Sequence, residues 1–259
     1  MLSAIPELAL QVLPDAAAVA ERVASLILQA RLEQPQRPLG LATGRTMEPV
    51  YAALRERLAN LSVAERTAVL RGWQSFNLDE YVGLGPADPG SFAAVMHDQL
   101  AVPLGLASAQ MHLPDGLAPD PAAEARRYAA AVAAAGGIGL QLLGLGLNGH
   151  VGFNEPPCGP DVACRCLTLS PATRAQNAGA FGGDPDAVPP LAITLGLAEI
   201  LAARELLLVV TGAAKAPILK RLLHQPASDR LPASWLRTHP RLTLLVDQAA
   251  AAGAASVVA

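Results

Sequence analysis

The chain has 259 residues, of which 52% are hydrophobic and 16% are charged. A chain of this length can bury a sizeable core, and its composition excludes a largely disordered protein. The formal net charge of −3 argues against general binding to nucleic acid or to an anionic membrane, because no overall positive charge is available to displace counterions.

The N-terminal residues do not resemble a secretory signal. Residues 1–13 contain Glu7 and no basic residue before their apolar positions, so we expect a cytoplasmic protein. The stretch 128–147 is apolar enough to suggest a membrane span. The Gly136-Gly137 pair divides it, and we therefore interpret it as a helix end followed by a strand.

Three cysteines, Cys158, Cys164 and Cys166, lie close together. An odd number of cysteines without a secretory signal argues against a disulfide framework. A thiolate metal site that includes His150 is the alternative, but C-x5-C-x-C is not a familiar zinc spacing. We expect free thiols and no bound metal.

The first expected helix begins after the N-cap residue Asp15 and runs to about Arg31. A short buried strand at residues 39–42 then leads through Thr43-Gly44-Arg45-Thr46 into a helix that begins near Met47. Such a turn exposes backbone N–H groups at the positive end of a helix, which suits a phosphate. Because many turns need glycine for shape alone, both interpretations stay open here.

A further helix is expected at residues 63–70 and a strand at residues 72–78. This strand ends at Asp79-Glu80-Tyr81. Adjacent carboxylates on a loop are usually solvated. An aspartate at the end of a buried strand can instead be partly desolvated and serve as a proton acceptor, so two interpretations remain.

Two more helices are expected at about residues 92–100 and 121–135, with His112 in a short linker between them. The second helix leads into residues 137–147, which are apolar or glycine except at Gln141 and predict a buried strand.

Four polar side chains follow that strand, interleaved with glycines: Asn148, His150, Asn154 and Glu155. Functional loops of an open α/β sheet lie at the carboxyl ends of its strands. We therefore expect the chemistry of the protein in this segment.

The last third begins with residues 159–188, a long irregular segment of the kind that forms lids or binding loops. Residues 193–196 then lead to a short helix, and strands are expected at 205–210 and 242–246. Lys215, one of only two lysines, follows the first of these strands at a glycine turn. The alternation of strand, loop and helix predicts one doubly wound α/β domain over residues 1–259, with a largely parallel sheet.

Four motifs now form a pattern. LGLATG at residues 39–44, FNLDEYVGL at 76–84, GHVGFNEP at 149–156 and VTGAAK at 210–215 resemble, in the same order, the glucosamine-6-phosphate deaminase/isomerase family. The resemblance covers nearly the whole chain. It implies a Rossmann-like fold and conversion of an amino-sugar 6-phosphate into a ketose 6-phosphate and ammonia, without a metal or redox cofactor.

The resemblance also implies roles for single residues. Asp79 matches the family's base, which moves a proton between C2 and C1. His150 matches the group that opens the pyranose ring, and Glu155 matches its carboxylate partner. An imidazole that titrates near neutrality can both give and take the ring proton. Lys215 and the turn of Thr43, Gly44, Arg45 and Thr46 match phosphate-binding elements.

Asn148 departs from the family pattern, which usually has an aspartate at this position. An asparagine can still orient the imidazole by a hydrogen bond, but it cannot stabilise the imidazolium by charge. We therefore expect His150 to be less basic than usual, with Glu155 as its only charged partner.

The predicted phosphate-binding residues also depart from the family pattern. A phosphate-binding arginine of well-known members falls on Gly179, whereas Arg45 stands where a small residue is common. We hypothesise that Arg45 supplies the missing charge, with Arg174 as a weaker candidate. Arg165 matches one member of an allosteric basic pair, but its companion is Leu167, so allosteric activation is not expected.

Asn148, together with residues 193–197 and 232–236, looks more like the galactosamine-6-phosphate branch than the glucosamine enzyme. The rival interpretations are a lactone hydrolase related to 6-phosphogluconolactonase and a non-catalytic sugar-phosphate sensor. Residues 79–81 and 153–156 favour the deaminase, and only one helix fits before residue 39, which leaves no room for a helix-turn-helix. The expected partner is a small sugar phosphate, and the sequence leaves a homo-oligomer open.

Overall fold

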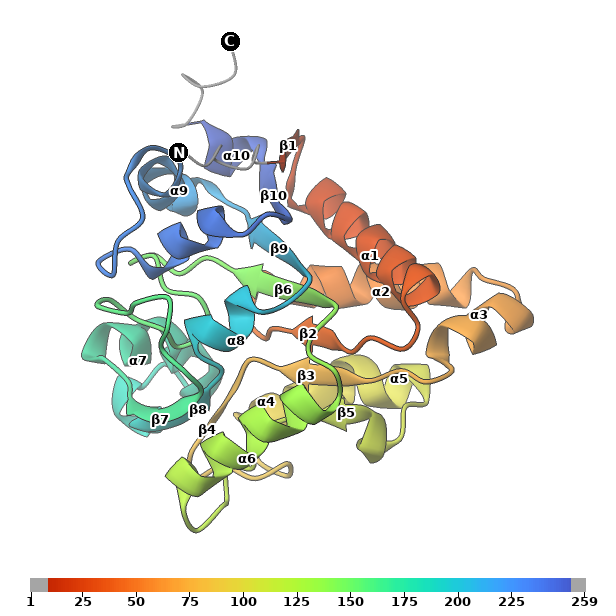
Figure 1. The fold of residues 1–259 in the computed structure, drawn as a ribbon, viewed down its shortest axis with the longest axis horizontal. Helices are drawn as coiled ribbons and strands as arrows, with labels where there is room; N and C mark the ends of the chain where they lie inside the picture. The colour runs from red at the N-terminus through yellow and green to blue at the C-terminus, as the bar shows by residue number, and fades with distance from the viewer. Residues whose placement is uncertain (1–8, 253–259) are drawn as a thin grey trace.

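The computed structural model describes residues 9–252 (Figure 1). Its centre is a seven-stranded sheet in which every neighbouring pair of strands is parallel. Helices flank this sheet, so the predicted Rossmann-like α/β fold is confirmed. In spatial order the strands are β1 (Ala9–Leu13), β10 (Leu242–Asp247), β9 (Glu205–Val210), β6 (Leu140–Gly144), β2 (Leu39–Leu41), β3 (Ser75–Asn77) and β5 (Met111–His112).

Several helices begin where the sequence supplies a cap. The Asp15 carboxylate accepts the N–H of Ala18 at 2.8 Å at the start of α1 (Ala16–Glu33). Ser62 and Glu65 form a capping box at the start of α3 (Val63–Leu70), whose predicted bounds are confirmed. The remaining α-helices are α2 (Glu48–Ala59), α4 (Phe92–Met96), α5 (Val102–Leu104), α6 (Pro121–Ala134), α7 (Pro171–Asn177), α8 (Leu197–Leu201), α9 (Ala216–His224) and α10 (Gln248–Ala251).

A second sheet was not expected. Strands β4 (Asp79–Tyr81), β8 (Leu191–Thr194) and β7 (Arg165–Thr168) form an antiparallel three-stranded sheet in the order β4-β8-β7. Asp79-Glu80-Tyr81 is therefore a strand and not a loop. Residues 159–188 are also more regular than predicted, since they contain β7, α7 and two short 3-10 helices, Ala178–Phe181 and Pro185–Ala187.

This second sheet has its own small core. Tyr81 from β4, Phe153 from the loop after β6, and Val188 pack there with Leu169, Ala178 and Ala192. Leu78 joins the two sheets, because its N–H donates to Leu41 and its carbonyl accepts the N–H of Leu195. Backbone hydrogen bonds toward both sheets thus hold Leu78, the residue that precedes Asp79.

Other predicted bounds needed correction. The strand expected at 137–147 is limited to β6, because Gly136 and Gly137 adopt φ of 84° and 77° and form a turn. The helix expected at 92–100 continues from α4 into a π-helical turn, His97–Ala101. His112 belongs to the edge strand β5 and not to a linker, and the edge strand β1 was not predicted.

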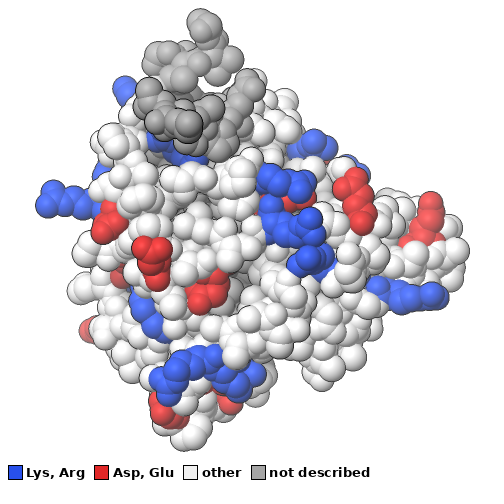
Figure 2. All heavy atoms as spheres, viewed as in Figure 1, with Lys and Arg blue, Asp and Glu red and all other residues white. Residues whose placement is uncertain are grey.

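Among residues 9–252, no helix is long and apolar enough to cross a membrane. The interpretation of residues 128–147 as a helix end and a strand is confirmed, since α6 ends at Ala134 and β6 begins at Leu140. On the face drawn in Figure 2, Lys and Arg side chains form small groups with Asp or Glu near most of them. The cysteines Cys158, Cys164 and Cys166 are free.

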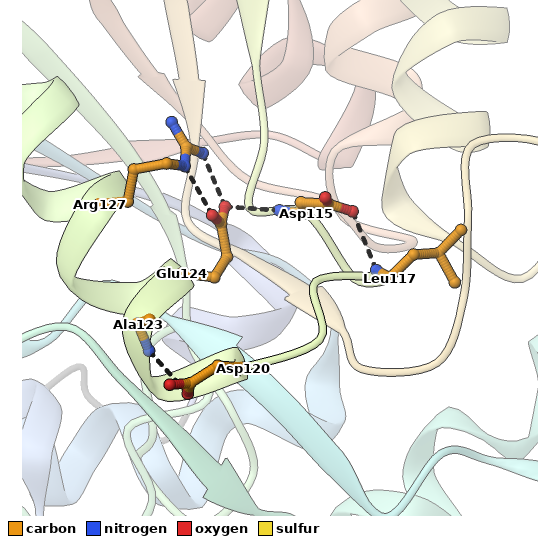
Figure 3. A network of polar contacts seen from close by, with 6 residues as sticks. All are labelled: Asp115, Leu117, Asp120, Ala123, Glu124 and Arg127. Atoms are coloured by element: carbon orange, nitrogen blue, oxygen red, sulfur yellow. Dashed lines mark hydrogen bonds and ion pairs between the residues drawn. The ribbon is translucent and has the colours of Figure 1, made fainter.

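A buried carboxylate ties the segment after β5 to α6 (Figure 3). Glu124 accepts the backbone N–H of Asp115 at 2.8 Å and two N–H groups of Arg127 at 2.6 and 2.7 Å. Gly116, which follows Asp115, accepts through its carbonyl the N–H of Gly83 at 2.8 Å. Gly83 lies just beyond β4. This network braces the turn that ends the strand carrying Asp79.

Candidate active site

Four adjacent strands of the main sheet deliver the predicted site residues to one edge. The strand order β9-β6-β2-β3 places their carboxyl ends side by side. Lys215 follows β9, His150 follows β6, the Thr43-Gly44-Arg45-Thr46 turn follows β2, and Asp79 follows β3. Parallel strands end at the same edge, so the sheet gathers residues that lie far apart in sequence.

The loop after β6, called the histidine loop below, folds tightly around His150. The N–H of Gly146 donates to the carbonyl of His150 at 2.9 Å, and the N–H of Gly149 donates to the carbonyl of Gly146 at 3.0 Å. A Cβ at position 146 would lie only 2.3 Å from Nε2 of His150. Gly146 is therefore required for the imidazole to lie against the loop backbone.

His150 is half-buried, and its Nδ1 is buried without a hydrogen-bond partner among the described residues. Burial lowers the pKa of His150 to about 4; the charge of Glu155 opposes this shift and that of Lys215 adds to it. The pKa lies below the near-neutral range, in the direction expected for a histidine that is less basic than usual, and burial is the main cause. His150 is neutral at pH 7 and starts as a proton acceptor.

Asn148 acts on the backbone of the loop. Its Oδ1 accepts the N–H of His150 at 3.1 Å, and the side chain makes no hydrogen bond to the imidazole. The expected orientation of the ring by Asn148 is therefore wrong. The amide stabilises the turn, a contact that an aspartate oxygen could make equally well.

Replacing Asn148 with aspartate should raise the pKa of His150 by about one unit, because a carboxylate then stands two residues from the imidazole. A histidine NMR titration measures this shift directly. Asn148→Ala is the matched variant that removes the turn contact without adding charge. An unchanged pKa in Asn148→Asp would show that position 148 does not tune His150.

Glu155 is held by Ser170, the N-cap of α7, and by Thr173 in its first turn. Its carboxylate accepts the N–H of Ser170 at 3.0 Å, the hydroxyl of Ser170 at 2.7 Å and the hydroxyl of Thr173. Burial alone would raise the pKa of Glu155, but the bonds from Thr173 and Ser170 and the charge of His150 lower it overall. Glu155 is thus a carboxylate whose charge acts on His150, as expected for its partner.

Asp79 lies apart from this pair on β4, opposite Thr194 of β8, and is only 6% exposed. A Cβ at Gly152 would lie 3.4 Å from its Oδ2, so the carboxyl group faces the histidine loop. Burial, and secondarily the charge of Glu80, raises the pKa of Asp79 to about 8. The desolvated interpretation of Asp79 is confirmed.

Glu80 has a structural role that differs from the role of Asp79. Its carboxylate accepts the backbone N–H groups of Tyr81, Phe92 and Ala93 at 2.8 to 3.0 Å, which anchors the start of α4. No hydrogen-bond donor among residues 9–252 contacts the carboxylate of Asp79. Of the two acids, Asp79 is the one available to a ligand.

Substitution of Asp79 should stabilise the protein at high pH. Its folded pKa lies above the unfolded value near 3.8, so the free energy of unfolding falls as pH rises through the window from about 4 to 8. Asp79→Asn should therefore be more stable than the parent at pH 9 and no more stable below pH 4, by urea unfolding. Glu124→Gln, which removes a carboxylate whose pKa is lowered, is the control and should destabilise the protein at pH 9. A less stable Asp79→Asn at pH 9 would contradict the buried-acid account.

Two positively charged side chains, Lys215 and Arg45, lie at the other side of the histidine loop. The Nζ of Lys215 donates to the carbonyl of Leu145 at 2.7 Å. Burial and then the charge of Arg45 lower the pKa of Lys215. Arg45 is exposed on the turn whose Gly44 has φ of 113°. The turns after β2 and β9 thus place two like charges near each other, an arrangement that an anion would relieve.

The other predicted arginines have structural partners. Arg174 donates to the carbonyl of Val188 at 3.1 Å and to Asp186, within the segment after β7. Arg165 donates to Oδ1 of Asn154 at 2.8 Å. Gly179 lies exposed in a 3-10 helix. The structure therefore gives no support to Arg174 as a phosphate ligand.

Some supporting residues were not assigned roles from the sequence. The buried amide of Asn154 donates to the carbonyls of Val151 and Leu195 and fixes the end of the histidine loop. Ser170 and Thr173 were missed entirely. The Ser-Pro start of α7 is an N-cap signal that could have located Ser170, but nothing in the sequence joins it to Glu155.

Comparison with known proteins agrees with this arrangement. Residues 15–244 match the model of the family described as glucosamine-6-phosphate isomerases/6-phosphogluconolactonase. The chain is 41% identical to a glucosamine-6-phosphate deaminase of Rhodopirellula baltica over 244 residues, which is 93% of this chain and 94% of that protein. It is 39% identical to one from a Geobacillus species over 230 residues, 89% of each chain.

Solved structures give the same result. A monomeric glucosamine-6-phosphate deaminase superposes with a TM-score of 0.87 at 34% identity, covering 95% of this chain and all of that one. The 6-phosphogluconolactonase of Trypanosoma cruzi, with a TM-score of 0.76 at 18% identity over 98% of this chain and all of that one, shares the fold alone. The chain belongs to the glucosamine-6-phosphate isomerase/6-phosphogluconolactonase family.

Proposed function

We propose that this protein is an isomerising deaminase that converts an amino-sugar 6-phosphate into the ketose 6-phosphate and ammonia. The observation that carries the proposal is the separation of two acid–base centres at one sheet edge. Neutral His150 with Glu155 forms one centre, and the buried acid Asp79 forms the other. The naming of similar proteins as glucosamine-6-phosphate deaminases supports the same reaction.

The reaction begins with binding and ring opening. The backbone turn at Gly44, with Arg45 and Lys215, binds the phosphate. Neutral His150 accepts the proton of the anomeric hydroxyl and passes it to the ring oxygen as the C1–O5 bond breaks. Glu155 stabilises the imidazolium that exists between these two transfers.

Asp79 then acts on the open chain. Its ionised form removes the proton from C2 while a proton of the ammonium group moves to O1, which gives an enolamine. Asp79 then returns its proton to C1, which leaves a protonated imine at C2. Water adds to this imine and ammonia departs, so the products are the 2-ketose 6-phosphate and ammonia. The cationic amino group of the substrate favours ionised Asp79 in the complex, which offsets its raised pKa in the free protein.

The substrate class includes glucosamine 6-phosphate and galactosamine 6-phosphate. The names of similar proteins favour the first. Asn148 and residues 193–197 and 232–236 favour the second. We also place the reaction in the cytoplasm, a location supported by the three free thiols.

The test is ammonia release from the two sugar phosphates side by side, with 6-phosphogluconolactone as a third substrate. We expect ammonia and ketose phosphate in equal amounts from at least one amino sugar. Hydrolysis of the lactone without ammonia release from either amino sugar would overturn the proposal.

A further inference from the structure

The start of α7 supplies every hydrogen bond that the carboxylate of Glu155 receives within residues 9–252. We propose that Ser170 and Thr173 are positioning residues that orient the Glu155 carboxylate and stabilise its charged form beside His150, so that docking of α7 completes the ring-opening pair. This inference rests on the proposed function for its kinetic consequence, but not for its effect on the charge of Glu155.

The hydroxyl of Ser170 serves two partners at once. It donates its only proton to Oε1 of Glu155 at 2.7 Å, and its oxygen accepts the N–H of Thr173 at 3.2 Å as the N-cap of α7. The Thr173 side chain is 3% exposed, and its hydroxyl also donates to Oε1 of Glu155. One carboxylate oxygen is therefore held by two hydroxyl groups whose geometry depends on the helix start.

These donors come from outside the histidine loop. Glu155 lies 15 residues before Ser170 and 18 before Thr173. Without these hydroxyl groups the carboxylate would lose the bonds that favour its ionised form. The protonated form of His150 acts on Glu155 by its charge, and Lys215 acts in turn on His150. The charge of the pair thus depends on a segment that contacts neither imidazole nitrogen by a hydrogen bond.

The far end of α7 is fixed to the other acid–base centre. Nδ2 of Asn177 donates to the hydroxyl of Tyr81 at 2.9 Å, and the ring of Phe181 packs edge-on against Tyr81 at 5.6 Å. Tyr81 lies on β4 with Asp79. Helix α7 and the 3-10 helix that follows it therefore join the strand of Asp79 to the carboxylate beside His150.

The experiment is a carbon NMR titration of the glutamate carboxyl groups, with Glu155 assigned by the loss of its signal in Glu155→Gln. Ser170→Ala and Thr173→Val should each raise the pKa of Glu155 and lower kcat for ammonia release by about tenfold, as loss of a charged hydrogen bond predicts. Ser170→Thr and Thr173→Ser keep the hydroxyl and should restore both values, which separates the bond from a general loss of folding.

Ser62→Ala is the matched control. The Ser62 hydroxyl also caps a helix and donates to a glutamate, Glu65, at 2.7 Å, but on exposed α3. It should raise the pKa of Glu65 and leave the pKa of Glu155 and kcat unchanged. A pKa of Glu155 that stays constant in folded Ser170→Ala and Thr173→Val would overturn the inference. Absence of ammonia release in the parent would instead overturn the proposed function, and the titration would still decide the charge of Glu155.

Discussion

Replacing Asp79 with asparagine should lower kcat by about 1,000-fold, the usual order of magnitude for loss of a general base. Asparagine has nearly the size of aspartate, and the backbone pairing of position 79 with Thr194 does not use the carboxyl group. KM should therefore change by about twofold or less, since the phosphate contacts are untouched. Steady-state ammonia release measures both constants.

The pH profile of the parent provides a second readout for Asp79. Its pKa of about 8 means that the basic form is the minor species at pH 7 and the major one at pH 9. The value of kcat/KM in the free enzyme should therefore rise with pH and level off above about 8. The pKa of His150, about 4, adds no further limb in this range. A flat profile, or full activity in Asp79→Asn, would remove Asp79 from the chemistry.

Removal of either cation at the phosphate site should raise KM by tenfold or more. Loss of one charged hydrogen bond is worth about 1.5 to 3 kcal/mol, so Arg45→Ala and Lys215→Met each weaken binding by at least about one order of magnitude. Their effects should not add fully, because the two charges already act on each other. Inhibition by inorganic phosphate should weaken in parallel with substrate binding.

Lys220 provides the matched control, since it is the only other lysine and lies exposed on α9. Lys220→Met should leave KM and phosphate inhibition unchanged. Lys215→Met should also raise the pKa of His150, because Lys215 lowers it in the parent. If Arg45→Ala bound substrate as the parent does, the phosphate would have to be held by the turn and Lys215 alone.

Much of the fold follows from local patterns. The cap at Asp15, the helix at residues 63–70 and the apolar strands β9 and β10 were all predicted close to their observed bounds. Each depends on a few neighbouring residues. The edge of the sheet that carries the site was also predicted from the sequence, because glycine turns and polar residues mark the ends of buried parallel strands.

The missed features depend on contacts between distant residues. The pairing of Asp79 with Thr194 joins residues 115 positions apart, and no periodicity in the three residues of β4 predicts it. The low pKa of His150 arises from burial, which only the packed structure determines. The bonds from Ser170 and Thr173 to Glu155 require the position of α7, which lay in a segment interpreted as irregular.

The most direct test follows the hydrogen at C2. Glucosamine 6-phosphate and galactosamine 6-phosphate carrying deuterium at C2 are incubated with the protein, and the ketose phosphate and the solvent are analysed. The account predicts that ammonia release breaks the C2–D bond, that deuterium appears at C1 of the ketose or in water, and that Asp79→Asn suppresses this transfer. Ammonia released with the deuterium still at C2 would contradict it.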